Sequence, residues 1–204
     1  ILLQQVDIDG QLRLKNSRVL IVGLGGLGAP VALYLAAAGV GELHLADFDT
    51  VDLTNLQRQI IHDTDSIGLS KVDSAIGRLS AINPEIRLIA HRTALDADSL
   101  AAAVSNVDLV LDCCDNFATR EAVNAACVAA GKPLVSGAAI RLEGQLSVFD
   151  PRRPESPCYH CLYGHGSDTE LTCSEAGVVG PLVGLVGSLQ ALEALKLLAG
   201  FGTP

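Results

Sequence analysis

The feature that most limits how this chain can fold is a glycine pattern directly after a short apolar run. Residues 18–22 (RVLIV) lead into Gly23, and Gly23, Gly25 and Gly28 are spaced as G-x-G-x-x-G. Glycines at this spacing allow a tight strand-to-helix turn and the close approach of a phosphate to the N–H groups of the helix N-terminus. The pattern predicts a nucleotide site in a strand–turn–helix unit, unless the glycines serve only to pack the helix on the strand.

Short apolar runs alternate with helical patterns along the first two thirds of the chain. We expect strands at residues 18–22, 42–46, 86–90, 108–111 and 134–136, and helices at 28–38, 69–82, 98–104 (capped by Asp98) and 119–130. Such alternation predicts an α/β fold, a doubly wound Rossmann-like and mostly parallel sheet with helices on both faces. Beyond it we expect an added antiparallel strand at 145–149, a long functional loop at 151–172 and a last helix at 181–198.

Composition excludes several classes of protein. A length of 204 residues favours one domain over residues 1–204, and 49% hydrophobic with 18% charged residues is a globular balance. The net charge of -9 gives no basic face for nucleic acid. The apolar stretch 176–199 is interrupted by Pro181, Gln190, Glu193 and Lys196, so we interpret it as a buried amphipathic helix rather than a membrane span. No secretory leader is visible, and we expect a cytoplasmic protein.

Polar residues follow the second predicted strand. Asp47 ends that strand about twenty residues after the glycines, where a carboxylate accepts hydrogen bonds from a ribose hydroxyl. Asn55, Gln57 and Arg58 come next, and Lys71 opens the following helix. Two cations and two amides suit a triphosphate whose charge moves during a reaction better than a nicotinamide cofactor. Ordinary surface charge is the alternative explanation for Arg58 and Lys71.

A second polar segment, residues 112–116 (DCCDN), ends the fourth predicted strand. Ligands of open α/β sheets bind at the carboxyl ends of the strands. Asp115 could therefore hold Mg²⁺, which takes one or two carboxylates plus phosphate oxygens, or it could cap the next helix. Asp112 has the same ambiguity, and Cys113 and Cys114 are most simply small core residues.

Five passages together resemble one known family: VLIVGLGGLG (19–28), DFDTVDLTNLQRQ (47–59), LDCCDN (111–116), SGAAIRLEGQLSVF (136–149) and TCSEAGVVGP (172–181). The whole chain resembles the MoeB/ThiF family of sulfur-carrier adenylyltransferases, which are similar to ubiquitin-activating enzymes. SGAAIRLEGQ is closer to the molybdopterin branch (MoeB) than to the thiazole branch (ThiF). The resemblance implies a homodimer that uses ATP to adenylate the C-terminal carboxylate of a ubiquitin-like sulfur carrier ending in Gly-Gly, with release of pyrophosphate.

The resemblance also implies roles for the residues named above. Arg58, Lys71 and Asp115 would be catalytic, with Asp115 on Mg²⁺. The ATP-binding set would be Gly23, Gly25, Gly26, Gly28, Asp47, Asp49, Asn55, Gln57, Arg58, Lys71, Asp115 and Asn116.

The remaining cysteines carry two further expectations. Cys158 and Cys161 form half of a C-x-x-C…C-x-x-C zinc site, which needs four ligands. The family carries its second pair near the C-terminus and usually continues upstream with a basic segment, so both ends of this chain look trimmed. We expect zinc to need two cysteines beyond Pro204 rather than His160 or His165. Cys173 is either a catalytic thiol that links covalently to the carrier, as in the thiazole branch, or an unreactive loop thiol.

Three rival functions stay open. The first is the thiazole-pathway carrier adenylyltransferase. The second is an NAD(P)-dependent oxidoreductase, which the glycine pattern alone would permit. The third is a non-catalytic binding module, against which Arg58, Lys71 and Asp115 argue.

Overall fold

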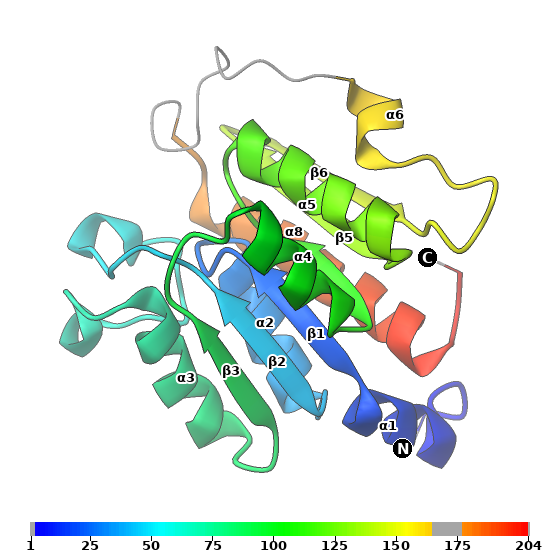
Figure 1. The fold of residues 1–204 in the computed structure, drawn as a ribbon. Helices are drawn as coiled ribbons and strands as arrows, with labels where there is room; N and C mark the ends of the chain where they lie inside the picture. The colour runs from blue at the N-terminus through cyan, green and yellow to red at the C-terminus, as the bar shows by residue number, and fades with distance from the viewer. Residues whose placement is uncertain (1–2, 165–176, 204) are drawn as a thin grey trace.

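A six-stranded sheet in the order β3-β2-β1-β4-β5-β6 forms the centre of the computed structural model, which describes residues 3–164 and 177–203 (Figure 1). The first five strands in this order run parallel, and β6 pairs antiparallel with β5. The predicted fold class is therefore confirmed. The strands are β1 (Arg18–Val22), β2 (Glu42–Ala46), β3 (Arg87–His91), β4 (Leu109–Asp112), β5 (Leu134–Ile140) and β6 (Glu143–Phe149).

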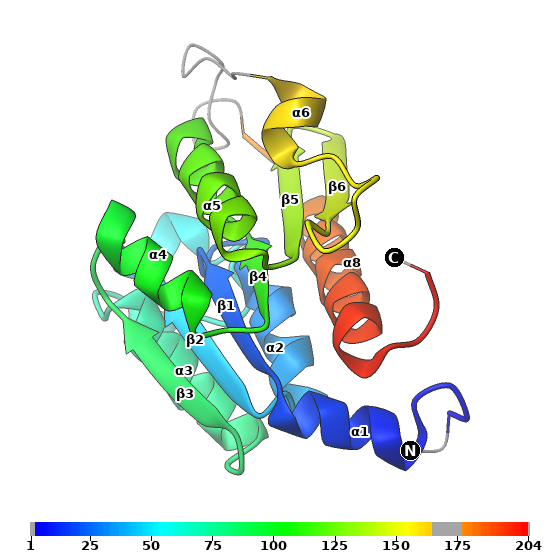
Figure 2. The same ribbon diagram turned by 45° about the vertical axis from the view of Figure 1, so that its right-hand side comes forward.

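Helices cover both faces of the sheet (Figures 1 and 2). One layer holds α2 (Gly28–Ala37), α3 (Lys71–Ile82) and α8 (Gly180–Ala199), with α1 (Asp7–Asn16) beside α8. The other layer holds α4 (Ala97–Ser105) and α5 (Phe117–Ala130), with the short α6 (Tyr159–Tyr163) against α5. Each layer closes its own apolar core, and β1 contributes to both because its side chains alternate between the two faces.

The strand order reverses between β1 and β4, which both lie at the middle of the sheet. The chain leaves β1 towards β2 and β3 on one side, and later returns through β4 to β5 on the other. The loops that follow β1 and β4 therefore part from each other and leave a crevice at the carboxyl ends of these strands. A polar crossing segment, with short 3-10 turns at Leu53–Asn55 and Thr64–Ser66, connects β2 to α3 at the same edge.

Several element boundaries differ from the sequence expectations. Helix α1 was not predicted, because only Gly10 and Leu14 of its residues are buried and its apolar pattern is weak. Asp96 rather than Asp98 caps α4, accepting a hydrogen bond from the Ser99 N–H. Helix α5 begins at Phe117 rather than 119, because Asn116 is its cap.

The region after β4 is more regular than the sequence suggested. β5 and β6 form a hairpin that pairs Leu134 with Phe149 at one end and Ile140 with Glu143 at the other, so both strands are longer than the predicted 134–136 and 145–149. The predicted loop 151–172 contains α6, and its last residues, 165–172, lie outside the described part of the chain.

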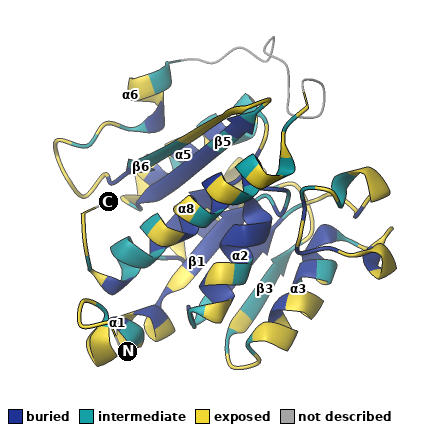
Figure 3. Ribbon diagram, turned by 180° about the vertical axis from the view of Figure 1, so that it is seen from behind, coloured by how far each residue is buried: buried dark blue, intermediate teal, exposed yellow. Residues whose placement is uncertain are grey.

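Helix α8 differs from the amphipathic helix that we expected. It is long and apolar enough to cross a membrane by length and composition, a criterion that core helices also meet. It packs against α2, β5 and β6, and its polar Gln190 points into the core with no exposed surface. Three leucines at helical spacing, Leu185, Leu189 and Leu192, are exposed instead. Exposed and buried segments alternate along α8 in Figure 3. The polar residues of α8 therefore do not mark its solvent side.

Candidate nucleotide and catalytic site

A cavity of about 1260 Å³ opens where the strand order reverses, between the glycine turn after β1, the crossing segment after β2 and the turn after β4. Its walls gather residues that are far apart in sequence. The lining includes all the predicted nucleotide-binding residues except Gly28, namely Gly23, Gly25, Gly26, Asp47, Asp49, Asn55, Gln57, Arg58, Lys71, Asp115 and Asn116. The structure thus brings the predicted set together, and the individual roles stay predictions.

The glycines of the turn serve two different purposes. Gly23 has a φ of 93°, and a Cβ there would lie 2.8 Å from the Cys113 carbonyl oxygen. A Cβ on Gly28 would collide with the carbonyl oxygen of Gly23, and one on Gly26 would lie 2.7 Å from Cγ1 of Val183. A Cβ on Gly25 would meet only Nε2 of Gln59, at 3.6 Å. The protein itself therefore requires glycine at 23, 26 and 28, whereas the bare backbone at Gly25 leaves room in the cavity for a ligand such as a phosphate.

Asp47 connects the end of β2 to the glycine turn. One carboxylate oxygen accepts a hydrogen bond from the Leu24 N–H at 2.8 Å, and the other accepts one from the Asp49 N–H at 2.9 Å. Each oxygen keeps a second lone pair. The carboxylate is therefore fixed at the cavity wall and retains the capacity to accept a hydroxyl hydrogen bond.

Lys71 lies beneath the cavity with its ammonium group paired. Its side chain is only 7% exposed, and Nζ lies 2.8 Å from Oδ2 of Asp49. The backbone of the two residues is also joined, by a hydrogen bond from the Lys71 N–H to the Asp49 carbonyl oxygen. Asp49 was predicted to bind the nucleotide; in the structure it holds the Lys71 ammonium at the cavity.

The crossing segment holds its own side chains in place. Nη1 of Arg58 donates to the Thr54 carbonyl oxygen at 3.3 Å, and Nε2 of Gln59 donates to Oδ1 of Asn55 at 2.7 Å. Gln59 is buried and lines the cavity, and its Oε1 has no partner among residues 3–164 and 177–203. Gln59 was not among the predicted site residues, although it lies inside the DFDTVDLTNLQRQ passage.

His62 lies behind the glycine turn as a neutral group. Its Nδ1 lies 2.8 Å from the Ser74 hydroxyl and its Nε2 lies 3.2 Å from the Leu24 carbonyl oxygen. Burial lowers the pKa of His62, and the nearby Lys71 charge acts in the same direction. An imidazole that donates to Leu24 and accepts from Ser74 stabilises the turn without adding charge.

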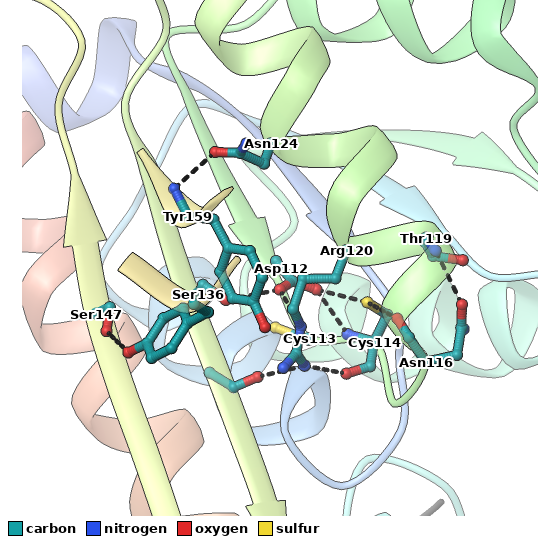
Figure 4. Close-up of polar contacts among 12 residues, drawn as sticks. Asp112, Cys113, Cys114, Asn116, Thr119, Arg120, Asn124, Ser136, Ser147 and Tyr159 are labelled. Carbon is teal, nitrogen blue, oxygen red and sulfur yellow. Dashed lines mark hydrogen bonds and ion pairs between the residues drawn. The ribbon is translucent and has the colours of Figure 1, made fainter. Parts of the chain in front are cut away.

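Two aspartates lie at the turn after β4, and Asp112 is the one beside Arg120 and Ser136 (Figure 4). Asp112 is fully buried and forms an ion pair with Arg120, so it faces the core rather than a ligand. Asn116 caps α5 through a 2.9 Å hydrogen bond from the Thr119 N–H. The carboxylate of Asp115 is exposed on the cavity wall and accepts no hydrogen bond within the described ranges. Of the two aspartates, Asp115 is the one placed to contact a ligand or Mg²⁺.

Cys113 and Cys114 are buried, and burial raises the pKa of both thiols well above the ordinary value. A thiol with a raised pKa carries little thiolate and is a poor nucleophile. The interpretation of both residues as part of the core therefore agrees with the structure.

Cys158 is the N-cap residue of α6 and Cys161 lies within the helix, so the pair is close to the cavity. The two Sγ atoms are 3.4 Å apart, and Tyr159 and Tyr163 of the same helix line the cavity. No group of three or more His, Cys, Asp or Glu side chains suited to a metal ion occurs in the part of the chain that the structure describes. The pair fits half of a zinc site and no more. Cys173 and His165 lie outside the described residues.

Comparison with known proteins decides the family. The model of the ThiF family matches residues 1–204. This chain belongs to the ThiF family. Molybdopterin-synthase adenylyltransferase of Escherichia coli (strain K12) is 56% identical over 204 residues, which cover all of this chain and 82% of the relative. Sulfur carrier protein ThiS adenylyltransferase of the same strain is 52% identical, with all of this chain and 81% of the relative covered.

Solved structures of the E. coli protein MccB share the fold of this ThiF-family chain. MccB with ATP has a TM-score of 0.82 and 25% sequence identity over 97% of this chain. MccB with MccA-N7isoASN has a TM-score of 0.85 and 26% identity over 97% of this chain. The chain spans about 60% of the length of these solved chains.

Proposed function

We propose that this protein is an adenylyltransferase that uses ATP to activate the C-terminal carboxylate of a ubiquitin-like sulfur carrier of the molybdopterin-synthase type. The observation that carries the proposal is the single cavity that combines a glycine turn, a fixed Asp47, two cations and the free carboxylate of Asp115. A nicotinamide oxidoreductase would need the first two features only. The family and the names of its relatives support the same choice.

The reaction follows from the charges that the cavity supplies. An oxygen of the carrier's terminal carboxylate attacks the α-phosphorus of ATP, the bond to the bridging oxygen breaks, and pyrophosphate leaves with the electron pair. An acyl-adenylate on the carrier remains. The attacking carboxylate and the triphosphate repel each other, so fixed positive charge at Arg58 and Lys71 would lower the barrier by positioning and electrostatics.

Asp115 is the residue that would hold Mg²⁺. Its exposed carboxylate on the cavity wall fits a cation that takes one or two protein carboxylates and completes its shell with water and phosphate oxygens. Bound there, Mg²⁺ would neutralise charge on the phosphates.

Zinc is proposed as a structural ion of a longer chain. Cys158 and Cys161 supply two of the four ligands, and two cysteines beyond Pro204 would supply the rest. Metal analysis of such a protein is expected to give one zinc per chain, and the 204-residue chain should bind zinc poorly, because two ligands rarely hold it against solvent. A longer protein with no stoichiometric zinc would contradict this assignment.

The thiazole-type function is the second candidate, because identity to a ThiS adenylyltransferase reaches 52%. The two candidate functions expect different roles for Cys173. For a molybdopterin-type enzyme, Cys173→Ala should leave adenylation and later sulfur transfer largely intact. Mass measurement under denaturing conditions, after incubation with carrier, ATP and a sulfur donor, distinguishes them. A carrier-sized adduct that vanishes in Cys173→Ala would identify the thiazole type.

The decisive experiment is ATP–pyrophosphate exchange with purified carriers that end in Gly-Gly. We expect exchange that needs both ATP and the intact Gly-Gly terminus, with the molybdopterin-type carrier exceeding the thiazole-type carrier. A carrier lacking its last glycine is the matched control. Absence of exchange with every carrier, in a protein that is folded, would refute the proposal.

A further inference from the structure

Two buried, oppositely charged residues lie directly beneath the turn that carries Asp115. Asp112, at the end of β4, has no exposed surface, and Arg120, in the first turns of α5, is 7% exposed. Nε of Arg120 lies 2.9 Å from Oδ2 of Asp112, as an ion pair rather than an aligned hydrogen bond (Figure 4). Burying two charges costs free energy that an apolar pair would not, so stability alone is a weak reason for this arrangement.

The ion pair holds both polar groups of the Cys114 backbone. Oδ1 of Asp112 accepts a hydrogen bond from the Cys114 N–H at 3.1 Å, and Nη2 of Arg120 donates to the Cys114 carbonyl oxygen at 2.8 Å. These atoms belong to two successive planar peptide groups, the second of which leads into Asp115. With both planes fixed, the chain enters Asp115 in a set direction. On the C-terminal side of Asp115, the Asn116 cap of α5 fixes the next residue of the chain.

The same pair is anchored to the neighbouring strand and helix. The Ser136 hydroxyl donates to Oδ2 of Asp112 at 2.7 Å, and Nη2 of Arg120 also donates to the Gly137 carbonyl oxygen at 3.0 Å. The ring of Tyr159 covers the guanidinium, with its centroid 5.7 Å from Cζ. Burial by itself would lower the pKa of Arg120, but the contributions of Asp112, Cys114 and Tyr159 together outweigh it. The net pKa is raised, so the guanidinium keeps its charge.

We propose that Asp112 and Arg120 are positioning residues for adenylation, which act by aiming the carboxylate of Asp115 into the cavity. The inference rests on the proposed function and adds two residues that need not touch ATP or the carrier. Arg120 reaches the cavity wall, so direct contact with a substrate is the rival explanation. The two explanations differ in one respect. A residue that acts through Asp115 has nothing left to do once Asp115 has lost its charge.

The test is a double-mutant cycle between Arg120→Lys and Asp115→Asn, measured as kcat and KM for ATP in pyrophosphate exchange. Lysine keeps the positive charge beside Asp112, but its ammonium lacks the planar fork that serves Asp112, Cys114 and Gly137 together. We expect each single variant to lower kcat by about tenfold or more, with KM for ATP in Arg120→Lys changed less than about threefold. The double variant should be within about twofold of Asp115→Asn alone.

A matched control and a stability measurement complete the cycle. Arg153→Lys changes an arginine in an exposed ion pair with Glu155 and should leave kcat unchanged. A role in folding alone would lower the melting temperature of Arg120→Lys but leave kcat per folded molecule at the wild-type value. Direct substrate contact would make the two effects multiply. Either result would overturn the proposal.

A second readout does not depend on the carrier. Calorimetry gives the factor by which Mg²⁺ tightens ATP binding, a factor that Asp115→Asn should reduce. We expect Arg120→Lys to reduce it by a similar amount, and an undiminished factor in Arg120→Lys would overturn the proposal. A wild-type protein that binds MgATP but adenylates no carrier refutes the proposed function alone. One that binds no MgATP refutes both.

Discussion

At the scale of single residues, the catalytic power that we propose for the cavity depends on two positively charged side chains that the protein holds in place. Lys71 is paired with Asp49 and Arg58 contacts its own segment through Thr54, so both charges are in place before any ligand arrives. Preorganised charge of this kind stabilises a transition state without reorganisation. We expect Lys71→Ala and Arg58→Ala each to lower adenylation by about 10²-fold or more, with a smaller change in ATP affinity. Pyrophosphate exchange and calorimetry measure the two effects.

The control for that prediction is Lys15→Ala, an exposed lysine in the last turn of α1. It should leave exchange at the wild-type rate. Near-normal exchange in both cavity variants would remove Arg58 and Lys71 from the catalytic set.

A second prediction at this scale concerns pH. Burial lowers the pKa of His62 in the folded protein, whereas the imidazole of an unfolded chain has a pKa of about 6.5. Between the folded and the unfolded pKa the unfolded chain binds more protons, so the free energy of unfolding rises with pH there and levels off above about 6.5. We expect urea unfolding to show lower stability at acidic pH, and His62→Gln to weaken this dependence.

His91 contributes in the same direction, because burial and the neighbouring His44 lower its pKa too, so His62→Gln should leave a residual slope. The exposed His160 provides the matched control, as His160→Gln. Equal slopes in the wild type and His62→Gln would show that the buried imidazole is not responsible.

At the scale of elements, the glycines of the turn between β1 and α2 fall into two groups. Some are required by packing, whereas Gly25 is free to face a ligand. A side chain at Gly25 meets little protein, so Gly25→Ala should leave the fold nearly as stable while its methyl group occupies cavity space. We expect ATP affinity to fall by about tenfold or more, a scale set by losing a few favourable contacts. Calorimetric titration with ATP, alongside a melting curve, measures both quantities.

The matched variant is Gly77→Ala in the middle of α3, where an added Cβ meets nothing within 4 Å. Alanine in a helix interior is favoured over glycine by about 0.5–1 kcal/mol, so this variant should melt higher and bind ATP normally. Unaltered ATP binding in Gly25→Ala would show that no phosphate lies against this backbone.

At the scale of the whole molecule, the outer face of α8 is an apolar surface on which a partner could pack. Leu185, Leu189 and Leu192 are exposed on one helix, an arrangement typical of surfaces that pack on a partner. We propose a homodimer, as the resemblance to the family implied, with this face in the interface. Light scattering after size exclusion should give twice the mass of one chain, and Leu185→Glu should shift it to a single chain.

Leu12→Glu, at an exposed leucine of α1, is the control and should stay dimeric. Circular dichroism checks that each variant is folded. A wild-type mass of one chain at micromolar concentration would contradict the dimer.

Much of the fold and most of the charged residues of the cavity could be predicted, because their sequence signals are local. Residues 18–22 form a buried strand because apolar side chains on both faces need a sheet covered on both sides, and G-x-G-x-x-G specifies the turn that follows. Once parallel strands are assigned, topology brings their carboxyl ends together, which places Asp47 and Asp115 at one cavity. Local sequence patterns are therefore enough to predict the fold class, the edge of the sheet that carries the site and most of the charged residues that line it.

Which polar residues pair with each other follows only from the packed fold. Asp112 and Asp115 are equivalent in the sequence, yet one is buried against Arg120 and the other is exposed. Gln190 looked like part of a polar helix face, but it donates a hydrogen bond to the Asp112 carbonyl oxygen, 78 residues away in the chain. Local periodicity reports whether a side chain is apolar, not whether a buried polar group will find a partner. That depends on the packing of distant elements, because a polar group is buried at low cost only where its partner already lies.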